Sequence, residues 1–297
     1  MRRKGRGVTD SRRWWGLPRF FRAGSCKSRS EKKETPYPLL YRHPSPQDAE
    51  AERRAELVDY AIRGLIGAAA ATEAAGAAVA YLLAYGIPAP ATVAERHNLV
   101  WTTEAALRRW RRRLEKQTGP YACAARAFAR VWAPALRRPG LLVPIRDGGR
   151  LVSAKVFREP DEGGKRAKYI LKGLSGRYLW GADEVGEADL VYIVEGEGDK
   201  MALDGSGLAG VAATVCTGGT GVAGDAVRLG RIAAWCDPLL QAARYYDGRP
   251  PRRVVVLADP DAAGRAAAVA VAGATGAEVS LLEADPRDLI RKLSTIA

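Results

Sequence analysis

The clearest pattern lies in residues 189–297, where short apolar runs alternate with longer helical stretches. Runs rich in Val, Ile and Leu predict four strands, in DLVYIVEG, VAATVCTGG, RRVVVLADPD and EVSLLEAD. The stretches that follow the first three, beginning at KMALD, AVRLG and GRAAA, have the spacing of helices. Strands that are apolar on both faces and alternate with helices are typical of a parallel sheet covered on both sides. We therefore expect an α/β fold with about four parallel strands and helices on both faces.

The preceding segment, residues 140–158, has the period of strands instead. Two apolar runs, Leu141–Ile145 and Leu151–Phe157, flank the turn Asp147-Gly148-Gly149, which predicts a hairpin. A polar stretch, DEGGKRAK, then leads into YILKGLSGRYLWG. We expect a small basic β subdomain over residues 136–186, ahead of an α/β domain over residues 187–297.

Residues 48–134 are rich in alanine and have the spacing of helices. The prolines of GIPAP, residues 86–90, interrupt this pattern because proline cannot continue a helix. LRRWRRRLEK, residues 107–116, follows with an apolar face surrounded by arginine. We expect a helical region over residues 39–135.

Charge adds a separate feature at the start of the chain. The 297 residues carry a net charge of +14, and residues 1–36 contribute +9 of it through twelve Lys or Arg and three acids. We interpret residues 1–38 as a disordered basic arm that attracts polyanions, nucleic acid above all. Trp14 and Trp15 lie among the arginines and favour stacking on bases. A solvated tail without a partner and an organelle transit peptide are alternative interpretations.

Several classes of protein are disfavoured. The four cysteines form no CxxC pair, and His43 and His97 are far apart, so neither a disulfide framework, nor a zinc ribbon, nor a histidine-based metal site is indicated. No apolar run reaches the roughly 18–20 residues that a membrane helix needs. We expect a cytoplasmic protein with reduced thiols and no membrane partner.

Acidic residues follow the predicted parallel strands. Glu195 ends the first strand, and Asp259 and Asp261 end the third. Because the carboxyl ends of parallel strands share one edge of a sheet, these carboxylates should converge there. A divalent cation would relieve their repulsion, and hard oxygen ligands select Mg²⁺ or Mn²⁺. Asp285, which we place at the end of the last strand, is a candidate further ligand, and Asp288 follows it.

Glycines accompany the acids. Gly218 and Gly219 end the second strand, where we expect their backbone amides to be open to a phosphate. The surrounding TGGTGVAG lacks the Lys-Ser/Thr pair of a P-loop, so no ATPase motif is present there.

Two of these segments, VEGEGDKMAL and LADPDAAGRAAA, resemble the signature motifs of Toprim domains, which occur in primases, topoisomerases and some nucleases. The resemblance implies a catalytic, metal-binding glutamate at Glu195 and paired aspartates at Asp259 and Asp261. It also matches Asp199 to an acid found in many primases. DPRDLIRK is similar to the trailing acidic motif, which includes Asp285.

The order of segments over roughly residues 138–292 resembles DnaG-type and phage helicase–primase enzymes. The resemblance implies a basic strand layer that holds template and nucleotide. The residues in comparable places are Lys155, Arg158, Lys168 and Arg177. The cysteines of a primase zinc module and a helicase are both missing from this sequence.

Residues 78–116 allow three interpretations. AVAYLLAYGIPAPATVAERHNLVW resembles the start of a primase core. Alternatively, the segment forms a helix-turn-helix whose second helix enters a DNA groove. In that case the DNA-binding side chains would be Arg108, Arg109, Arg111 and Arg112. In the third interpretation, this arginine-coated helix only packs on the sheet.

Together these features predict a DNA primase-like core that joins nucleoside triphosphates into short RNA primers on a single-stranded DNA template. Mg²⁺ or Mn²⁺ is the expected cofactor, and a separate replicative helicase is a candidate partner. One alternative is a non-catalytic DNA-binding replication or plasmid factor with a structural Toprim domain. A second alternative is a Toprim metal-dependent nuclease, since the same acids can activate water.

Overall fold

The computed structural model describes residues 46–71, 75–147, 149–160, 166–171, 179–207, 212–240 and 252–294. All of them belong to one compact unit, Pro44–Ala297. The basic arm expected over residues 1–38 lies outside the described residues. Among the helices that the structure describes, none is both long and apolar enough to cross a membrane.

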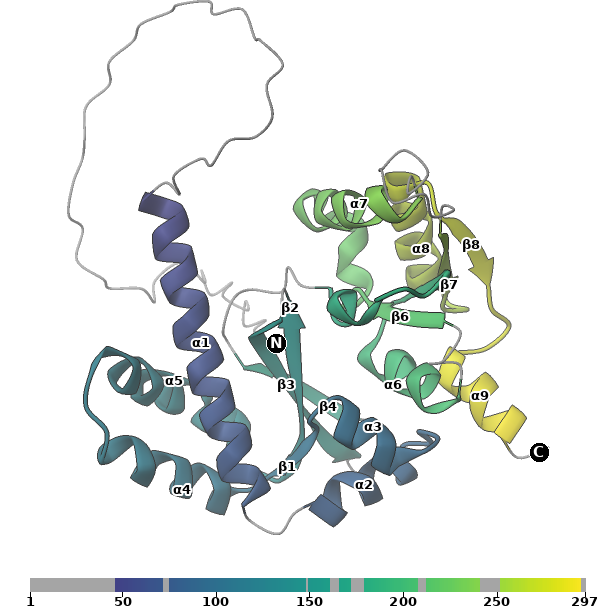
Figure 1. The fold of residues 1–297 in the computed structure, drawn as a ribbon. Coiled ribbons are helices and arrows are strands. Elements are labelled where there is room, and N and C mark those ends of the chain that lie inside the picture. Colours follow the sequence, from purple (N-terminus) through teal and green to yellow (C-terminus); the bar gives the residue numbers. More distant parts are fainter. Residues whose placement is uncertain are drawn as a thin grey trace, which may run out of the picture. The chain divides into compact units, whose positions relative to one another are not determined.

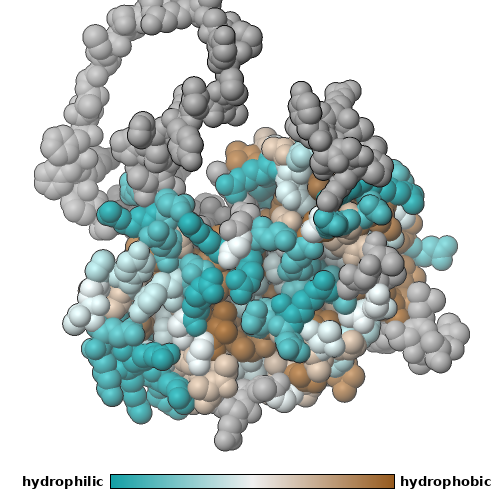
Figure 2. Space-filling model, viewed as in Figure 1, coloured by the Kyte–Doolittle hydropathy of each residue, from teal (hydrophilic) through white to brown (hydrophobic). Residues whose placement is uncertain are grey.

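Five helices lie in the first part of the described chain, as the alanine-rich pattern predicts. They are α1 (Pro46–Ala70), α2 (Ala75–Ala84), α3 (Pro90–Arg96), α4 (Glu104–Glu115) and α5 (Pro120–Leu136). Helices α1, α4 and α5 share a core in which Trp110 stacks on Trp132, with ring centroids 5.7 Å apart. The Thr103 side chain caps α4 by accepting a hydrogen bond from the Ala106 amide. The surface over α4, at the lower left of Figure 2, is hydrophilic.

The first of two described sheets is antiparallel, with the strand order β1-β2-β3-β4. Its strands are β1 (Val100–Thr102), β2 (Gly140–Asp147), β3 (Arg150–Pro160) and β4 (Arg166–Leu171). The hairpin expected around Asp147 is confirmed by the pairing of β2 with β3. Strand β1 was not expected, because a run of three residues is too short to show alternation.

Strand β1 excludes one of the three interpretations of residues 78–116. It lies between α3 and α4 and pairs with β2, with Trp101 opposite Leu141. A helix-turn-helix joins its two helices by a short turn. The helix-turn-helix interpretation is therefore wrong for α3 and α4, because a strand of the antiparallel sheet occupies the place of the turn.

The predicted parallel sheet is confirmed, in the order β6-β5-β7-β8. Its strands are β5 (Leu190–Val194), β6 (Ala212–Cys216), β7 (Arg253–Ala258) and β8 (Glu278–Leu281). The helical segments are η1 (Ala182–Glu184), α6 (Glu197–Gly205), η3 (Thr220–Gly224), α7 (Ala226–Leu240), α8 (Ala262–Thr275) and α9 (Pro286–Ser294). The chain thus has the α/β architecture that its hydrophobic pattern predicts.

Helices cover both faces of the parallel sheet (Figure 1). Val191 and Ile193 point to one face, where they share a core with residues of α7 and α8. Val194 belongs to the other face and packs with Met201 of α6. This alternation follows from strand geometry, in which successive side chains point to opposite faces.

The second of these cores crosses the domain limits expected from the sequence. It contains residues from each of the three segments 39–135, 136–186 and 187–297, including Tyr81, Val143 and Met201. The limits themselves stay a prediction. The shared core joins the antiparallel sheet and α2 to α6, the helix that leads away from Glu195.

Candidate active site

Glu195 and Asp259 occupy the same edge of the parallel sheet. Glu195 directly follows β5 and Asp259 directly follows β7, and these strands are neighbours in the sheet. Ile193 pairs with Val256. The same register, continued past these residues, places Glu195 opposite Ala258, the residue before Asp259. Both side chains are partly buried. The structure thus brings together the ends of two strands whose acids are far apart in the sequence.

Asp261 caps the helix that follows. It is the N-cap of α8, and its Oδ1 accepts a hydrogen bond from the Gly264 amide at 2.6 Å. Gly264 is constrained by its neighbour Asp259, because a Cβ at position 264 would lie 2.5 Å from the Asp259 Cβ. The glycine of DPDAAG therefore allows α8 to start close to Asp259, which holds both aspartates at the sheet edge.

Asp199 joins the acids from the first turn of α6. It is buried, and its Oδ2 accepts a hydrogen bond from the Gly196 amide at 3.1 Å, which caps the helix. Burial raises the pKa of Asp199 to about 8, with further contributions from the charges of Asp285 and Asp259. These interactions show that acids from α6, from the end of β7 and from the start of α9 lie close enough to repel one another.

Asp285 precedes α9 and does not end the last strand as expected, since β8 stops at Leu281. Its Oδ1 accepts a hydrogen bond from the backbone amide of Arg287 at 2.9 Å, and its Oδ2 lies 3.4 Å from Nη2 of the same arginine. Asp199 and Asp285 are also linked by a hydrogen bond between their side chains. We call Glu195, Asp199, Asp259, Asp261 and Asp285 the acidic edge.

The carboxylate oxygens of the acidic edge are suitable ligands for a hard divalent cation. All five side chains are carboxylates, which is the ligand type that Mg²⁺ and Mn²⁺ prefer. Burial raises the pKa of Asp199, and the charges of Asp285 and Asp259 raise it further, so a bound cation would favour the ionised carboxylate. Among the described residues, only His97, Glu184 and Asp204 have ligand atoms within 4.8 Å of one another. The carboxylates of the acidic edge would therefore have to move closer together to bind an ion.

The expectation for Gly218 and Gly219 is wrong. Their amides are not open to a phosphate, because both donate hydrogen bonds to the Glu195 carbonyl, at 3.0 and 2.9 Å. Both glycines have positive φ, 82° and 121°, a conformation that suits glycine. Their role is therefore to fold the chain after β6 back onto Glu195, which fixes the backbone of that residue.

Lys155 lies beside the acidic edge. It is buried in β3, and its ammonium forms an ion pair with Glu197 in the first turn of α6. The antiparallel sheet is therefore tied by charge to the helix that carries Asp199. Of the other expected basic residues, Lys168 lies in β4 opposite Phe157, and Arg177 lies outside the described residues.

Arg158 has a different role from the one expected. Its guanidinium is buried and donates hydrogen bonds to the carbonyls of Ala135, Arg138 and Pro139. These carbonyls belong to the end of α5 and the residues after it, whose acceptors have no partner within a helix. Arg158 thus stabilises the end of α5 instead of facing template or nucleotide.

The arginines of α4 differ in their surroundings. Arg108, Arg109 and Arg112 are exposed, whereas Arg111 is partly buried and donates to the Ala129 carbonyl in α5. Arg108 pairs with Glu104 one turn earlier, at 2.7 Å. The opposite face of the helix, with Leu107, Trp110 and Leu114, is buried. This arrangement agrees with the interpretation of α4 as a packing helix with a charged outer face.

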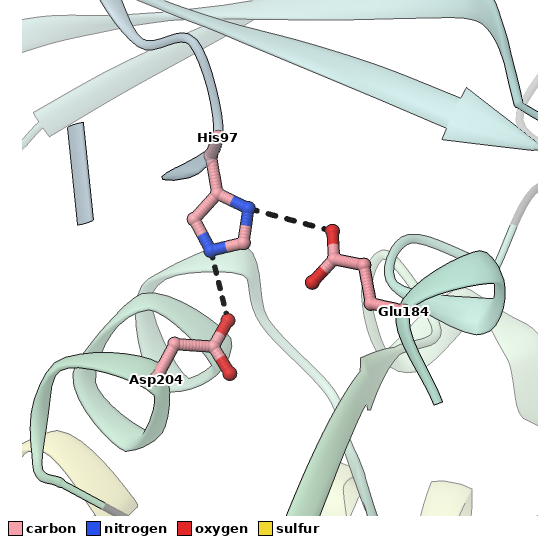
Figure 3. Close-up of side chains that lie close together, drawn as sticks. All are labelled: His97, Glu184 and Asp204. Atoms are coloured by element: carbon pink, nitrogen blue, oxygen red, sulfur yellow. Dashed lines mark hydrogen bonds and ion pairs between the residues drawn. The ribbon is translucent and has the colours of Figure 1, made fainter. Parts of the chain in front are cut away.

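A second cluster of charges lies at the other end of α6 (Figure 3). We call His97, Glu184, Lys200 and Asp204 the buried ion cluster. His97 Nε2 lies 2.9 Å from Asp204 Oδ2, and His97 Nδ1 lies 3.5 Å from Glu184 Oε1. The Lys200 ammonium donates to Asp204 Oδ2 at 2.8 Å and to Glu184 Oε2 at 2.9 Å. The cluster joins the end of α3 to α6 and η1.

The cation of the buried ion cluster is the ammonium group of Lys200, whose side chain is fully buried. Burial by itself would raise the pKa of Glu184, but His97 and Lys200 together lower it to about 2. The pKa of Asp204 is lowered by the same partners, again against the effect of burial. A metal ion between these carboxylates would have to displace the ammonium, so this group is a structural ion network.

Sequence reasoning missed the buried ion cluster. The sequence shows no second histidine near His97, and the partners of His97 are carboxylates that come close only in the folded chain. The spacing of Lys200 and Asp204, one helical turn apart, was the one local signal available. Gly181 makes room for the cluster, because a Cβ there would lie 2.7 Å from the Lys200 Nζ.

Comparison with known proteins identifies the fold. No protein-family model and no curated protein matches the chain. Among solved structures, the zinc-binding and RNA polymerase domains of the Aquifex aeolicus primase match with a TM-score of 0.55 and 19% identity over 84% of this chain. This chain spans 61% of the Aquifex chain.

The RNA polymerase domain of the Mycobacterium tuberculosis primase DnaG matches with a TM-score of 0.53 and 20% identity, over 80% of this chain and 79% of that domain. Identities this low show the fold alone. The course of the backbone nevertheless follows that of the matched domains of two primases. This chain has the fold of the DnaG-type primase RNA polymerase domain.

Proposed function

We propose that this chain is a primase-type nucleotidyltransferase that joins nucleoside triphosphates into short RNA primers on a single-stranded DNA template. The observation that carries the proposal is the acidic edge. Carboxylates from α6, from the ends of β5 and β7, and from the start of α9 lie along one edge of a primase-type fold. Such an edge is suited to phosphoryl transfer, whose catalysis depends on charge neutralisation and positioning.

The acidic edge would hold Mg²⁺ or Mn²⁺ through Glu195, Asp259 and Asp261. When bound, the ion lowers the pKa of an attacking ribose hydroxyl and neutralises charge on the reacting phosphates. The chain itself fixes where these carboxylates stand. Gly218 and Gly219 hold the Glu195 backbone, and Gly264 lets α8 start beside Asp259.

The antiparallel sheet would bind the template and the nucleotide on the side of the acidic edge. Lys155 supports this assignment because its ion pair with Glu197 ties β3 to the first turn of α6. Lys168 and Arg177 would add positive charge from β4 and from the segment after it. A backbone-binding role of this kind makes affinity for DNA fall with salt concentration.

The partners follow from this activity. A primer synthase acts where duplex DNA has been opened, so we propose a separate replicative helicase as the partner that supplies single strands. The activity would take place in the cytoplasm. The described cysteines, Cys123, Cys216 and Cys236, are free thiols and agree with a reducing compartment.

Primer synthesis on single-stranded DNA with labelled ribonucleotides and Mg²⁺ tests the proposal. The wild-type chain should make short RNA products, and Glu195→Gln or Asp259→Asn should abolish them. Glu95→Gln is the matched control, because Glu95 is an exposed acid on α3 and should leave synthesis unchanged.

Two other outcomes would contradict the proposal in favour of a different function. DNA cleavage without nucleotides that Glu195→Gln abolishes would indicate a metal-dependent nuclease. Tight DNA binding without any product, unchanged by Asp259→Asn, would indicate an accessory DNA-binding protein whose parallel sheet is structural.

A further inference from the structure

An arginine lies within the acidic edge. Arg287, in the first turn of α9, contacts Asp285 twice: its backbone amide donates to Oδ1 at 2.9 Å, and its Nη2 lies 3.4 Å from Oδ2. It also interacts electrostatically with Asp199 and Asp288. A positive side chain is therefore placed among carboxylates that would otherwise need metal ions to offset their charge.

Tyr85 holds this arginine in place. The guanidinium of Arg287 lies over the Tyr85 ring, with Cζ 4.5 Å from the ring centroid. Tyr85 itself stacks on Tyr81, with ring centroids 5.9 Å apart. Gly198 makes room for this arrangement, because a Cβ at that position would lie 3.0 Å from the Tyr85 hydroxyl. The side chain of Arg287 is only 24% exposed, so its charge is fixed beside the acids.

The contacts divide the acidic edge into two groups. In the first group, Asp199 and Asp285 share a hydrogen bond, and Arg287 engages both oxygens of Asp285. The second group is formed by Glu195, Asp259 and Asp261, at the ends of β5 and β7. Arg287 supplies a cation to the first group, and the carboxylates of the second group are the ones that would hold a metal ion.

We propose that Arg287 takes the place of a second divalent ion, so that the acidic edge binds a single Mg²⁺ or Mn²⁺ through Glu195, Asp259 and Asp261. Asp285 then acts as the partner of Arg287 and is not a metal ligand. This inference rests on the metal chemistry of the proposed function. It differs from the two-ion arrangement in which paired metals clamp the attacking and leaving oxygens, because one of the two charges is covalently built into the chain.

Counting bound Mn²⁺ tests this inference without any measurement of activity. The full chain is titrated with Mn²⁺ in the absence of nucleotide, and free Mn²⁺ is followed by electron paramagnetic resonance. We expect one ion per wild-type chain and two per Arg287→Gln chain, because glutamine removes the charge and frees Asp285. Arg287→Lys keeps the positive charge and should still bind one ion.

Arg253→Gln is the matched control. Arg253 is also paired with a carboxylate, Glu278, but it begins β7 at the opposite edge of the sheet, so the variant should bind one ion. Thermal melting shows whether each variant is folded. If Arg287→Gln does not fold, the wild-type count still decides the question.

The outcomes separate this inference from the proposed function. Two ions per wild-type chain, or one ion per folded Arg287→Gln chain, would overturn the role of Arg287 and leave the metal chemistry in place. A wild-type chain that binds no Mn²⁺ would overturn both, because the proposed function itself requires a bound ion.

Discussion

At the scale of single residues, the acids at the strand ends could be predicted from the sequence because their placement depends on local pattern alone. A buried strand that ends in Glu195 or Asp259 puts that residue at the carboxyl edge of any parallel sheet. The hydrogen-bond partners of other backbone amides and side chains could not be predicted in this way. The amides of Gly218 and Gly219 bond to Glu195, and the Arg158 guanidinium bonds to the end of α5, and both contacts are non-local.

Asp199→Asn should stabilise the metal-free protein at neutral pH. The pKa of Asp199 is raised to about 8, so folding binds a proton that the unfolded carboxyl releases above about pH 4. Stability should therefore fall as the pH rises from about 4 towards 8. Asparagine can still accept from the Gly196 amide and donate to Asp285. We expect a gain of at least about 1.4 kcal/mol, which is one pKa unit.

Thermal unfolding of both proteins with a chelator across this pH range measures the effect. The difference between variant and wild type should vanish near pH 4, where the unfolded carboxyl is also protonated. An equal difference at every pH would mean that the carboxyl charge is not the cause.

Gly264→Ala should destabilise the protein by about 1–3 kcal/mol, the usual cost of overpacking. The added methyl would lie 2.5 Å from the Asp259 Cβ, so α8 or Asp259 would have to move. Gly273→Ala, in the same helix but with open space around it, should instead stabilise by about 0.5–1 kcal/mol. Urea unfolding compares the two, and equal effects would contradict the close approach.

At the scale of elements, periodicity predicted the parallel strands and most helices, because burial on one or both faces imposes a repeat on each of them. It failed for β1, whose three residues are held by pairing with β2. Periodicity also gave no indication that the end of α3 contacts α6. That connection is made by His97, Lys200 and Asp204, whose interactions appear only once the antiparallel and parallel sheets are in contact.

Lys200→Met should remove the cation that the carboxylates of the buried ion cluster share. Breaking a buried ion pair by deleting one partner costs about 3–5 kcal/mol, because the remaining charges stay uncompensated. The pKa of Glu184 is lowered to about 2, so the contribution of Lys200 is present above about pH 4.5 and is lost as the pH falls towards 2.

Urea unfolding at several pH values, with the exposed Lys116→Met as control, checks this expectation. The destabilisation in Lys200→Met should be largest at neutral pH and shrink in acid. A destabilisation no greater than that of Lys116→Met would contradict the electrostatic role of the cluster.

At the scale of the whole molecule, the fold agrees with the order of motifs in the sequence, and the site is assembled from segments far apart in the chain. The charge is also uneven at this scale, with +9 of +14 in residues 1–36. We expect a variant without residues 1–38 to bind single-stranded DNA with a weaker dependence on salt. For every phosphate that the shortened chain no longer neutralises, the slope of log affinity against log salt should become shallower by about 0.7.

Fluorescence anisotropy at several salt concentrations measures this slope. A substitution at the acidic edge, such as Asp261→Asn, serves as the control and should not make the slope shallower. An unchanged slope in the shortened chain would mean that the basic arm does not bind DNA.

The central claim is that the acidic edge catalyses primer synthesis. Its most direct test is the incorporation of labelled ribonucleotides on a single-stranded template by the purified chain. The account predicts short products that require a divalent ion, disappear with Asp259→Asn and persist with Glu95→Gln. A folded wild-type chain that binds both Mn²⁺ and single-stranded DNA, yet forms no product with any template sequence, would contradict it.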